Sequence, residues 1–292
     1  MNPIAKIVTF LGLSSLFLAL PSPVLRDRGI TFLDLKAIAQ DNSNNFDNSI
    51  VPTNLELELL VKTIENFFAG DRYQTESQIS LEGKGKEFSV TIRARSTAFI
   101  DRSQKFRSQF AFVNDLGEIQ QEYEFISDGK QVWLYDKTRA QYAIFTLEEF
   151  FESDNSMALG ISSFLFIEFA NFISNLRETQ GQEFSLAQIL QEAIANNNIL
   201  LQKTAHRWNN REYSVYEFSD PSADFNMSLW VDSETAYLKQ IIASGGEENI
   251  EEFILQENII RRQEIPSSEN ITFQFIPPSS VQKTETINIF DF

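Results

Sequence analysis

Apolar residues around position 60 recur every three or four residues, as they do on one face of a helix. Asn54 stands in front of this segment as a capping residue, and Gly70 follows it. We therefore predict a helix over Leu55–Ala69. Its apolar face consists of Leu57, Leu60, Ile64, Phe67 and Phe68.

From Tyr73 onward the period changes to two, which is typical of strands that bury one face. On one of these strands Phe106, Phe110 and Phe112 share a face. Asp128-Gly129 then marks a tight hairpin, because both residues tolerate positive φ. The pattern predicts an antiparallel meander with one apolar face.

The middle of the chain is helical by the same criteria. Thr146, with Glu149 three residues later, forms a capping box. Ile161–Leu176 is apolar nearly all round, and Ser185–Ala195 is amphipathic. Strands return from Tyr213, and the last expected strand is Ile271–Phe275. We predict an α+β, mainly antiparallel fold in which helices are inserted into one large sheet.

The N-terminus has the features of an export signal. Lys6 precedes an apolar run over residues 7–20, and Ala37-Ile38-Ala39 offers a small-residue cleavage site. We predict a signal peptide over 1–39, a flexible segment over 40–53 and one domain over 54–292. An uncleaved anchor over residues 4–24 is the alternative. The predicted location is the periplasm.

Charge and composition exclude several classes of protein. The 292 residues carry a formal net charge of −17, so a nucleic-acid partner is not expected. There is no Cys and one His, which excludes thiolate metal sites and two-histidine metal motifs. We expect no metal, no cofactor and a monomer.

Motifs that resemble catalytic or phosphate sites have simpler interpretations. Gly83-Lys84-Gly85 lacks the rest of a phosphate loop and sits where a hairpin turns. His206 is expected at a surface or sheet edge. Adjacent glutamates such as Glu148 and Glu149 could serve a glycosidase, but glutamates in turns are usually solvated. We predict no catalytic residues and no enzyme, and a carboxylate-dependent hydrolase remains the least favoured alternative.

The aromatic content is the unusual feature, since the chain has 27 Phe against 7 Tyr and 3 Trp. Each single Phe is best explained as core. The run of Phe, Leu and Ile between residues 164 and 173 nevertheless covers too much of the helix circumference for a surface helix. A phenylalanine-rich sheet face under an apolar helix describes a cavity for a hydrophobic ligand.

Four motifs, in order, give the chain a resemblance to a known family. Residues 127–136 read SDGKQVWLYD, and Arg102–Arg107 precedes an aromatic strand. Residues 228–232 read SLWVD and are followed by LKQI at 238–241, and residues 271–278 read ITFQFIPP. Together they resemble the LolA/LolB superfamily of outer-membrane lipoprotein carriers. Ser103 stands where the family usually has proline.

The resemblance implies a half-open β-barrel of about ten or eleven strands, closed by a helical lid over an apolar cavity. We predict a soluble, LolA-like carrier of acyl chains of lipoproteins or lipids, with an inner-membrane donor and an outer-membrane acceptor. A lipid-sensing module of the same fold is the alternative. The predicted cavity residues are Phe106, Phe110, Phe112, Phe125, Trp133, Phe273 and Phe275.

The lid is predicted over Ile161–Leu176, where helical spacing aligns four side chains. These are Leu165, Phe169, Phe172 and Leu176. Arg102 matches the family arginine that ties the lid to the barrel, so the resemblance implies hydrogen bonds from Arg102 to lid backbone.

Overall fold

The structure is a computed structural model that describes residues 54–85, 89–180, 185–196, 199–220, 225–247, 250–266 and 268–290. The predicted signal peptide and the segment 40–53 lie outside the described residues. Within those ranges, no helix is both long and apolar enough to cross a bilayer.

The described strands form one 12-stranded sheet in which almost every neighbour is antiparallel. The order across it is β12-β6-β5-β4-β3-β2-β1-β11-β10-β9-β8-β7. The first meander is β1 (Arg72–Lys84), β2 (Ser89–Asp101), β3 (Lys105–Val113), β4 (Ile119–Asp128), β5 (Gln131–Asp136) and β6 (Gln141–Thr146). The second is β7 (Leu200–Trp208), β8 (Arg211–Asp220), β9 (Phe225–Asp232), β10 (Leu238–Glu247) and β11 (Ile250–Glu264).

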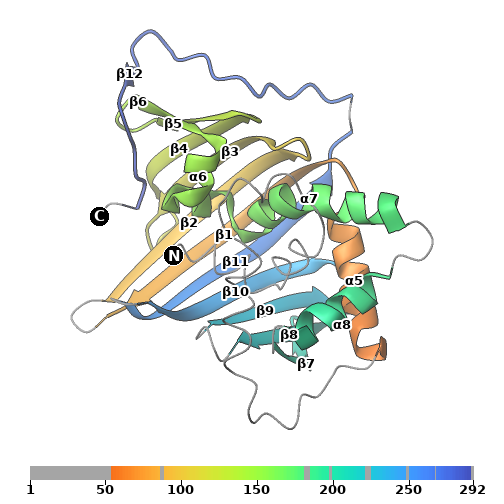
Figure 1. Cartoon of the computed structure of the whole chain (residues 1–292). Coiled ribbons are helices and arrows are strands. Elements are labelled where there is room, and N and C mark those ends of the chain that lie inside the picture. The colour runs from red at the N-terminus through yellow and green to blue at the C-terminus, as the bar shows by residue number, and fades with distance from the viewer. Residues whose placement is uncertain are drawn as a thin grey trace, which may run out of the picture.

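The sheet does not close on itself, because β12 (Gln282–Lys283) and β7 are its two edges. Helices cover one face of it, which we call the inner face (Figure 1). They are α5 (Asn54–Phe67), α6 (Leu147–Glu152), the 3₁₀ helix η1 (Asp154–Leu159), α7 (Ile161–Gln180) and α8 (Leu186–Asn196). The predicted half-open barrel with a helical lid is confirmed, with twelve strands instead of about ten or eleven.

Local sequence signals explain where several elements begin and turn. The Thr146 hydroxyl accepts from the Glu149 amide, and the Glu149 carboxylate accepts from the Thr146 amide at 2.7 Å, so the predicted capping box starts α6. At the β4–β5 hairpin the Asp128 carboxylate accepts from the amides of Lys130 and Gln131. Gly129 has φ of 92°, which only glycine adopts without strain.

The inner face carries the core. Alternate residues of β3 point inward, so Phe106, Phe110 and Phe112 are buried beside Phe125 of β4. Phe150 of α6 packs on this group, with ring centroids 5.6 Å from Phe106 and 5.8 Å from Phe125. This half of the inner face is therefore filled by aromatic side chains.

The predicted last strand, Ile271–Phe275, is wrong. Residues 271–278 have no ladder partner and pass over the outer face of the first meander. The Phe275 ring lies 5.6 Å from Tyr135 and 5.4 Å from Tyr142, and the Thr272 carbonyl accepts from Arg107. Residues 271, 273 and 275 are half-buried and alternate with exposed residues, so the segment has the alternation of a strand without a ladder partner. The chain then joins the sheet edge at β12, parallel to β6 (Figure 1).

Candidate functional site

An apolar cavity lies between the helices and β8–β10. It has a volume of about 100 Å³, and we call it the helix-side pocket. From α5, α7 and α8 it is lined by Leu60, Thr63, Ile64, Phe67, Phe68, Leu165, Phe169, Leu186, Leu190 and Ile194. From the sheet side it is lined by Ile199, Phe218, Met227, Leu229 and Leu238.

The helix-side pocket offers almost no polar chemistry to a ligand. Thr63 is its one polar residue, and its hydroxyl donates to the Leu59 carbonyl one helical turn earlier, at 2.8 Å. A ligand there is bound by removing apolar surface from water. Because pockets for drug-sized molecules usually measure about 300–1,000 Å³, a long acyl chain fits only if the helices move outward.

Two of the four predicted lid side chains line this pocket. Leu165 and Phe169 of α7 are buried and face it. Phe172 and Leu176 belong to later turns of α7, whose side chains lie outside the described part of the structure. The helical spacing therefore places at least two of the four predicted side chains against one cavity. The role of all four in opening the lid stays a prediction.

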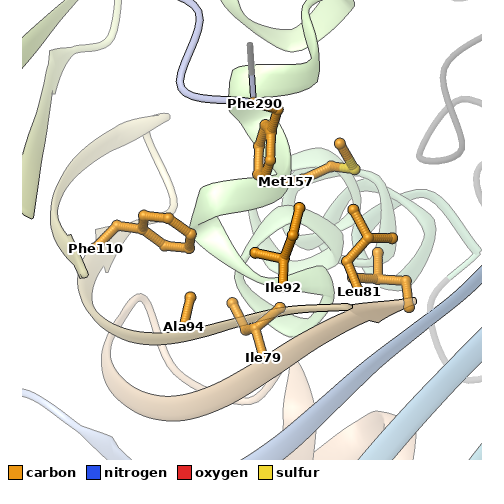
Figure 2. Close-up of a pocket in the computed structure, with 8 residues that line it drawn as sticks. Ile79, Leu81, Ile92, Ala94, Phe110, Met157 and Phe290 are labelled. Atoms are coloured by element: carbon orange, nitrogen blue, oxygen red, sulfur yellow. The ribbon is translucent and has the colours of Figure 1, made fainter. Parts of the chain in front are cut away.

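The predicted cavity residues divide between the two faces of the sheet. Phe110 lines a second cavity of about 10 Å³, the tail-side pocket, and Phe106, Phe112 and Phe125 are buried on the same inner face. The tail-side pocket is lined by Ile79, Leu81, Ile92, Ala94, Phe110, Met157, Leu255 and Phe290 (Figure 2).

Trp133, Phe273 and Phe275 lie on the outer side instead. Trp133 alternates with the buried, inward Val132 and Leu134. Phe273 and Phe275 belong to the segment that crosses the outer face, where Phe273 lies 5.9 Å from the Arg72 guanidinium. These three residues line neither pocket.

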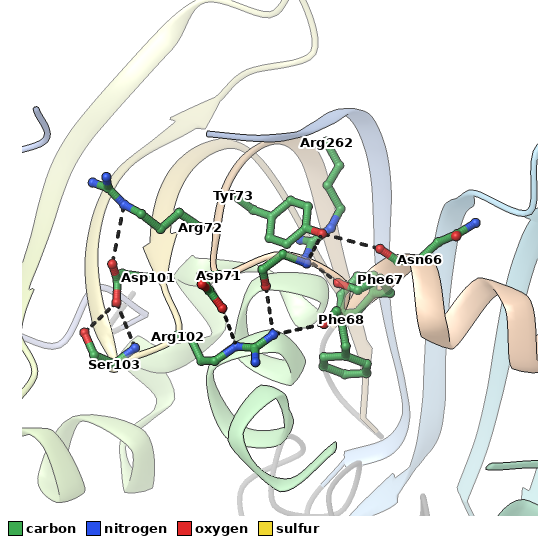
Figure 3. A network of polar contacts seen from close by, with 11 residues as sticks. Asn66, Phe67, Phe68, Asp71, Arg72, Tyr73, Asp101, Arg102, Ser103 and Arg262 are labelled. Carbon is green, nitrogen blue, oxygen red and sulfur yellow. Dashed lines mark hydrogen bonds and ion pairs between the residues drawn. The ribbon is translucent and has the colours of Figure 1, made fainter. Parts of the chain in front are cut away.

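Arg102 ties a helix to the sheet, but the helix is α5. Its guanidinium donates to the carbonyls of Phe68 and Gly70, each at 3.0 Å, and lies 3.3 Å from Asp71 (Figure 3). Those carbonyls follow directly on α5 and do not belong to the predicted lid over Ile161–Leu176. Cationic donors at the C-terminal end of a helix oppose its partial negative charge.

A second arginine, Arg262 of β11, pins the same end of α5 and was not predicted. It donates to the Phe67 carbonyl and to the Thr75 hydroxyl, both at 3.1 Å. Its guanidinium lies 4.0 Å from the ring centres of Phe67 and Tyr73, and 5.1 Å from that of Phe166. Burial lowers the pKa of Arg262 to about 10, so it keeps its charge at neutral pH. These cation–π contacts join α5, α7 and the sheet.

The start of α7 is held by Glu257, a fully buried carboxyl group on β11. Its oxygens accept from the Ser162 amide at 2.7 Å, the Ser162 hydroxyl at 2.7 Å and the Ser77 hydroxyl at 2.6 Å. A negative charge at a helix N-terminus is favourable. Gly160 leaves the necessary space, because a Cβ there would come within 2.7 Å of a Glu257 oxygen.

Burial raises the pKa of Glu257, and the hydrogen bonds from Ser77 and Ser162 offset only part of that effect. The folded protein therefore binds a proton over a pH range in which the unfolded chain has lost it. By linkage, the free energy of unfolding decreases as pH rises from 4.5, the ordinary pKa of the group, through its raised value.

The acidic side chains and the histidine of the described residues do not gather into a metal site. Among them, no group of three or more His, Asp or Glu is placed to hold a metal ion. His206 is exposed on the edge strand β7, with its ring 5.1 Å from that of Trp230, as the sequence indicated. Glu149 serves its capping box.

No protein-family model and no curated protein matches the chain. Among solved structures, LprF from Mycobacterium bovis is similar at 8% identity and a TM-score of 0.38, over 77% of this chain and 98% of that one. An uncharacterized conserved protein from Thermus thermophilus is 10% identical with a TM-score of 0.36, over 79% and 99%. A LolA superfamily protein from Nitrosomonas europaea is 10% identical with a TM-score of 0.25, over 71% and 93%.

The superfamily that the sequence motifs resemble is thus among the structural matches.

Proposed function

We propose that this protein is an exported, non-enzymatic carrier that binds acyl chains of lipoproteins or lipids and passes them on toward the outer membrane. The observation that carries the proposal is the helix-side pocket, in which fourteen of fifteen lining residues are apolar. Each buried methylene contributes about 0.8 kcal/mol, so an acyl chain is bound without a charged anchor.

The sequence motifs that resemble the LolA/LolB superfamily support the same proposal. Release needs a competitor for the apolar surface. Phe169 supplies one, because its ring already lies against the pocket and takes up space that an acyl chain would fill.

The test compares two substitutions that each introduce aspartate. Phe169→Asp places a carboxylate in the pocket, whereas Ile260→Asp changes an exposed residue of β11. Titration with a fluorescent fatty-acid analogue should show weakened binding for Phe169→Asp and unchanged binding for Ile260→Asp. Circular dichroism checks that both variants retain their strands. If Phe169→Asp binds as well as the wild type, the pocket is ordinary core and the proposal fails.

Transfer separates a carrier from a lipid-sensing module of the same fold. The loaded protein is mixed with acceptor vesicles, and movement of the fluorescent chain is followed over time. A carrier releases its chain to the acceptor. A sensor retains it, and that outcome overturns the carrier role while leaving the pocket intact.

A further inference from the structure

The C-terminal segment Ile287–Phe290 occupies part of the inner face. Ile287 and Ile289 are buried, with 8% and 2% of their surface exposed. The Phe290 ring lies 6.3 Å from Phe110 and 5.9 Å from Phe112. The segment reaches this position after β12, at the far edge of the sheet from the helix-side pocket.

One buried side chain holds the backbone of this segment. The Asn155 side-chain amide of η1 donates to the Ile287 carbonyl at 2.8 Å, and its oxygen accepts from the Ile289 amide at 3.0 Å. The segment forms no ladder with the strands that it covers. Asn155 and the apolar side chains of Ile287, Ile289 and Phe290 therefore help to keep it in place.

Beneath this segment lies the tail-side pocket. Phe290 closes it from one side, opposite Ile79 and Ala94, while Met157 and Phe110 flank it (Figure 2). All of its lining residues are apolar. Its volume of about 10 Å³ is no more than a single water needs, so Phe290 and its neighbours fill nearly all of this space.

The two pockets share a floor on the inner face. Directly paired residues of antiparallel strands lie on the same side of a sheet. The pairs connect Phe218 to Met227, Met227 to Ala243, Ala243 to Leu255, Leu255 to Leu81, and Leu81 to Ile92. The row starts in the helix-side pocket and ends in the tail-side pocket. At about 4.8 Å between strands it spans roughly 24 Å.

We propose that Ile287–Phe290 is a displaceable plug over a second acyl-chain subsite, which continues the helix-side pocket along this floor. The inference rests on the proposed function. The plug and an acyl chain have the same apolar chemistry and compete for the same surface. A long chain reaches the second subsite and displaces the plug, whereas a short chain remains in the helix-side pocket.

The plug's position can be followed directly, because the chain has no cysteine. Asn288 is exposed between the two buried isoleucines, so Asn288→Cys accepts a spin label without entering the core. The spectrum should show an immobilised label that becomes mobile when palmitic acid is added. Octanoic acid should leave it immobilised.

Affinity gives an independent measurement. Truncation after Glu285 removes the plug, and Asn155→Ala releases it with the chain intact. Both variants should bind a fluorescent palmitate analogue with a Kd about tenfold lower than the wild type, because the subsite no longer has to be vacated. Binding of an octanoate analogue should not change. Circular dichroism confirms folding, and Asn155→Ala decides the matter if the truncated chain does not fold.

The outcomes separate this inference from the proposed function. If all forms bind palmitate equally and the label stays immobilised, the carrier function stands and the plug is overturned. If no form binds palmitate or octanoate, the proposed function fails. The competition between the plug and lipid is then refuted as well.

Discussion

Two phenylalanines of α7 allow the ligand site to be tested against a matched control. Phe169 lines the helix-side pocket and is 1% exposed, and Phe166 is fully buried three residues earlier. Phe166 does not line the pocket and instead packs on Phe68, Tyr73 and Arg262. Phe169→Ala and Phe166→Ala therefore remove the same ring from the same helix on two different sides.

The expected costs in stability are similar. Replacing a buried Phe by Ala costs about 3–5 kcal/mol, because the lost packing is joined by a cavity. At about 2–4 °C per kcal/mol for a chain of this size, each variant should melt roughly 10 °C below the wild type. Differential scanning calorimetry of the two variants without lipid gives this baseline.

The affinity for lipid should distinguish the two variants. In Phe169→Ala, an acyl chain can fill the space that the ring leaves. Three methylenes there regain about 2.4 kcal/mol at about 0.8 kcal/mol each. That is roughly a fiftyfold decrease in Kd. In Phe166→Ala the vacated space lies behind Phe68, which lines the pocket, so the Kd should decrease much less than in Phe169→Ala.

The assay is a titration with the fluorescent fatty-acid analogue, repeated as a thermal shift at saturating lipid. Phe169→Ala should recover more of its lost melting temperature than Phe166→Ala, because tighter binding adds more stability. Equal gains in both variants would refute the assignment of Phe169 to the ligand surface. A loss of binding in Phe169→Ala alone would refute the competition between its ring and the ligand for the same space.

Two further variants test how the helices are held. Glu257→Gln keeps the shape of the side chain and removes its titration. Above pH 4.5 its free energy of unfolding, measured in urea, should therefore fall less with rising pH than that of the wild type; equal slopes would contradict the raised pKa. Arg102→Leu removes the donors to Phe68 and Gly70. It should lower the free energy of unfolding by about 2 kcal/mol and speed amide hydrogen exchange at the end of α5. It should also raise the affinity for acyl chains. Unchanged exchange would show that Arg102 does not hold α5.

Glutamine suits position 257 because the network around it can reverse direction. A Gln oxygen can accept from the Ser162 amide in place of one carboxylate oxygen. The Gln amide then donates to the hydroxyls of Ser77 and Ser162, which accept as readily as they donate. The variant therefore changes the charge and leaves no buried polar group without a partner.

Much of the fold could be predicted because local patterns match local structure. The capping box at Thr146, the hairpin at Gly129 and the inward alternation of β3 depend on residues close in sequence. The edge strand β7 was missed for a physical reason. Nearly all of its residues are exposed, so its sequence has no alternation of apolar and polar residues to detect.

The site was harder to predict because it depends on contacts distant in sequence. The position of the larger cavity follows from how α5 and α8 lie on β8–β10, which no local pattern encodes. Glu257 belongs to a strand with other glutamates nearby and has no local mark of burial. Its burial is explained only by the tertiary structure, in which the Ser162 amide of α7 donates to its carboxyl group.

The order of the strands has a consequence for how the chain folds. Within each meander, neighbouring strands are close in sequence, whereas the seam between β1 and β11 pairs Tyr73 with Glu264 and Lys84 with Glu252. Closing that seam costs the most loop entropy, and contacts between distant residues slow folding. We expect the two meanders to form first and the seam to join them last. Until then both halves expose phenylalanine-rich faces, so the unjoined chain is the species most exposed to aggregation.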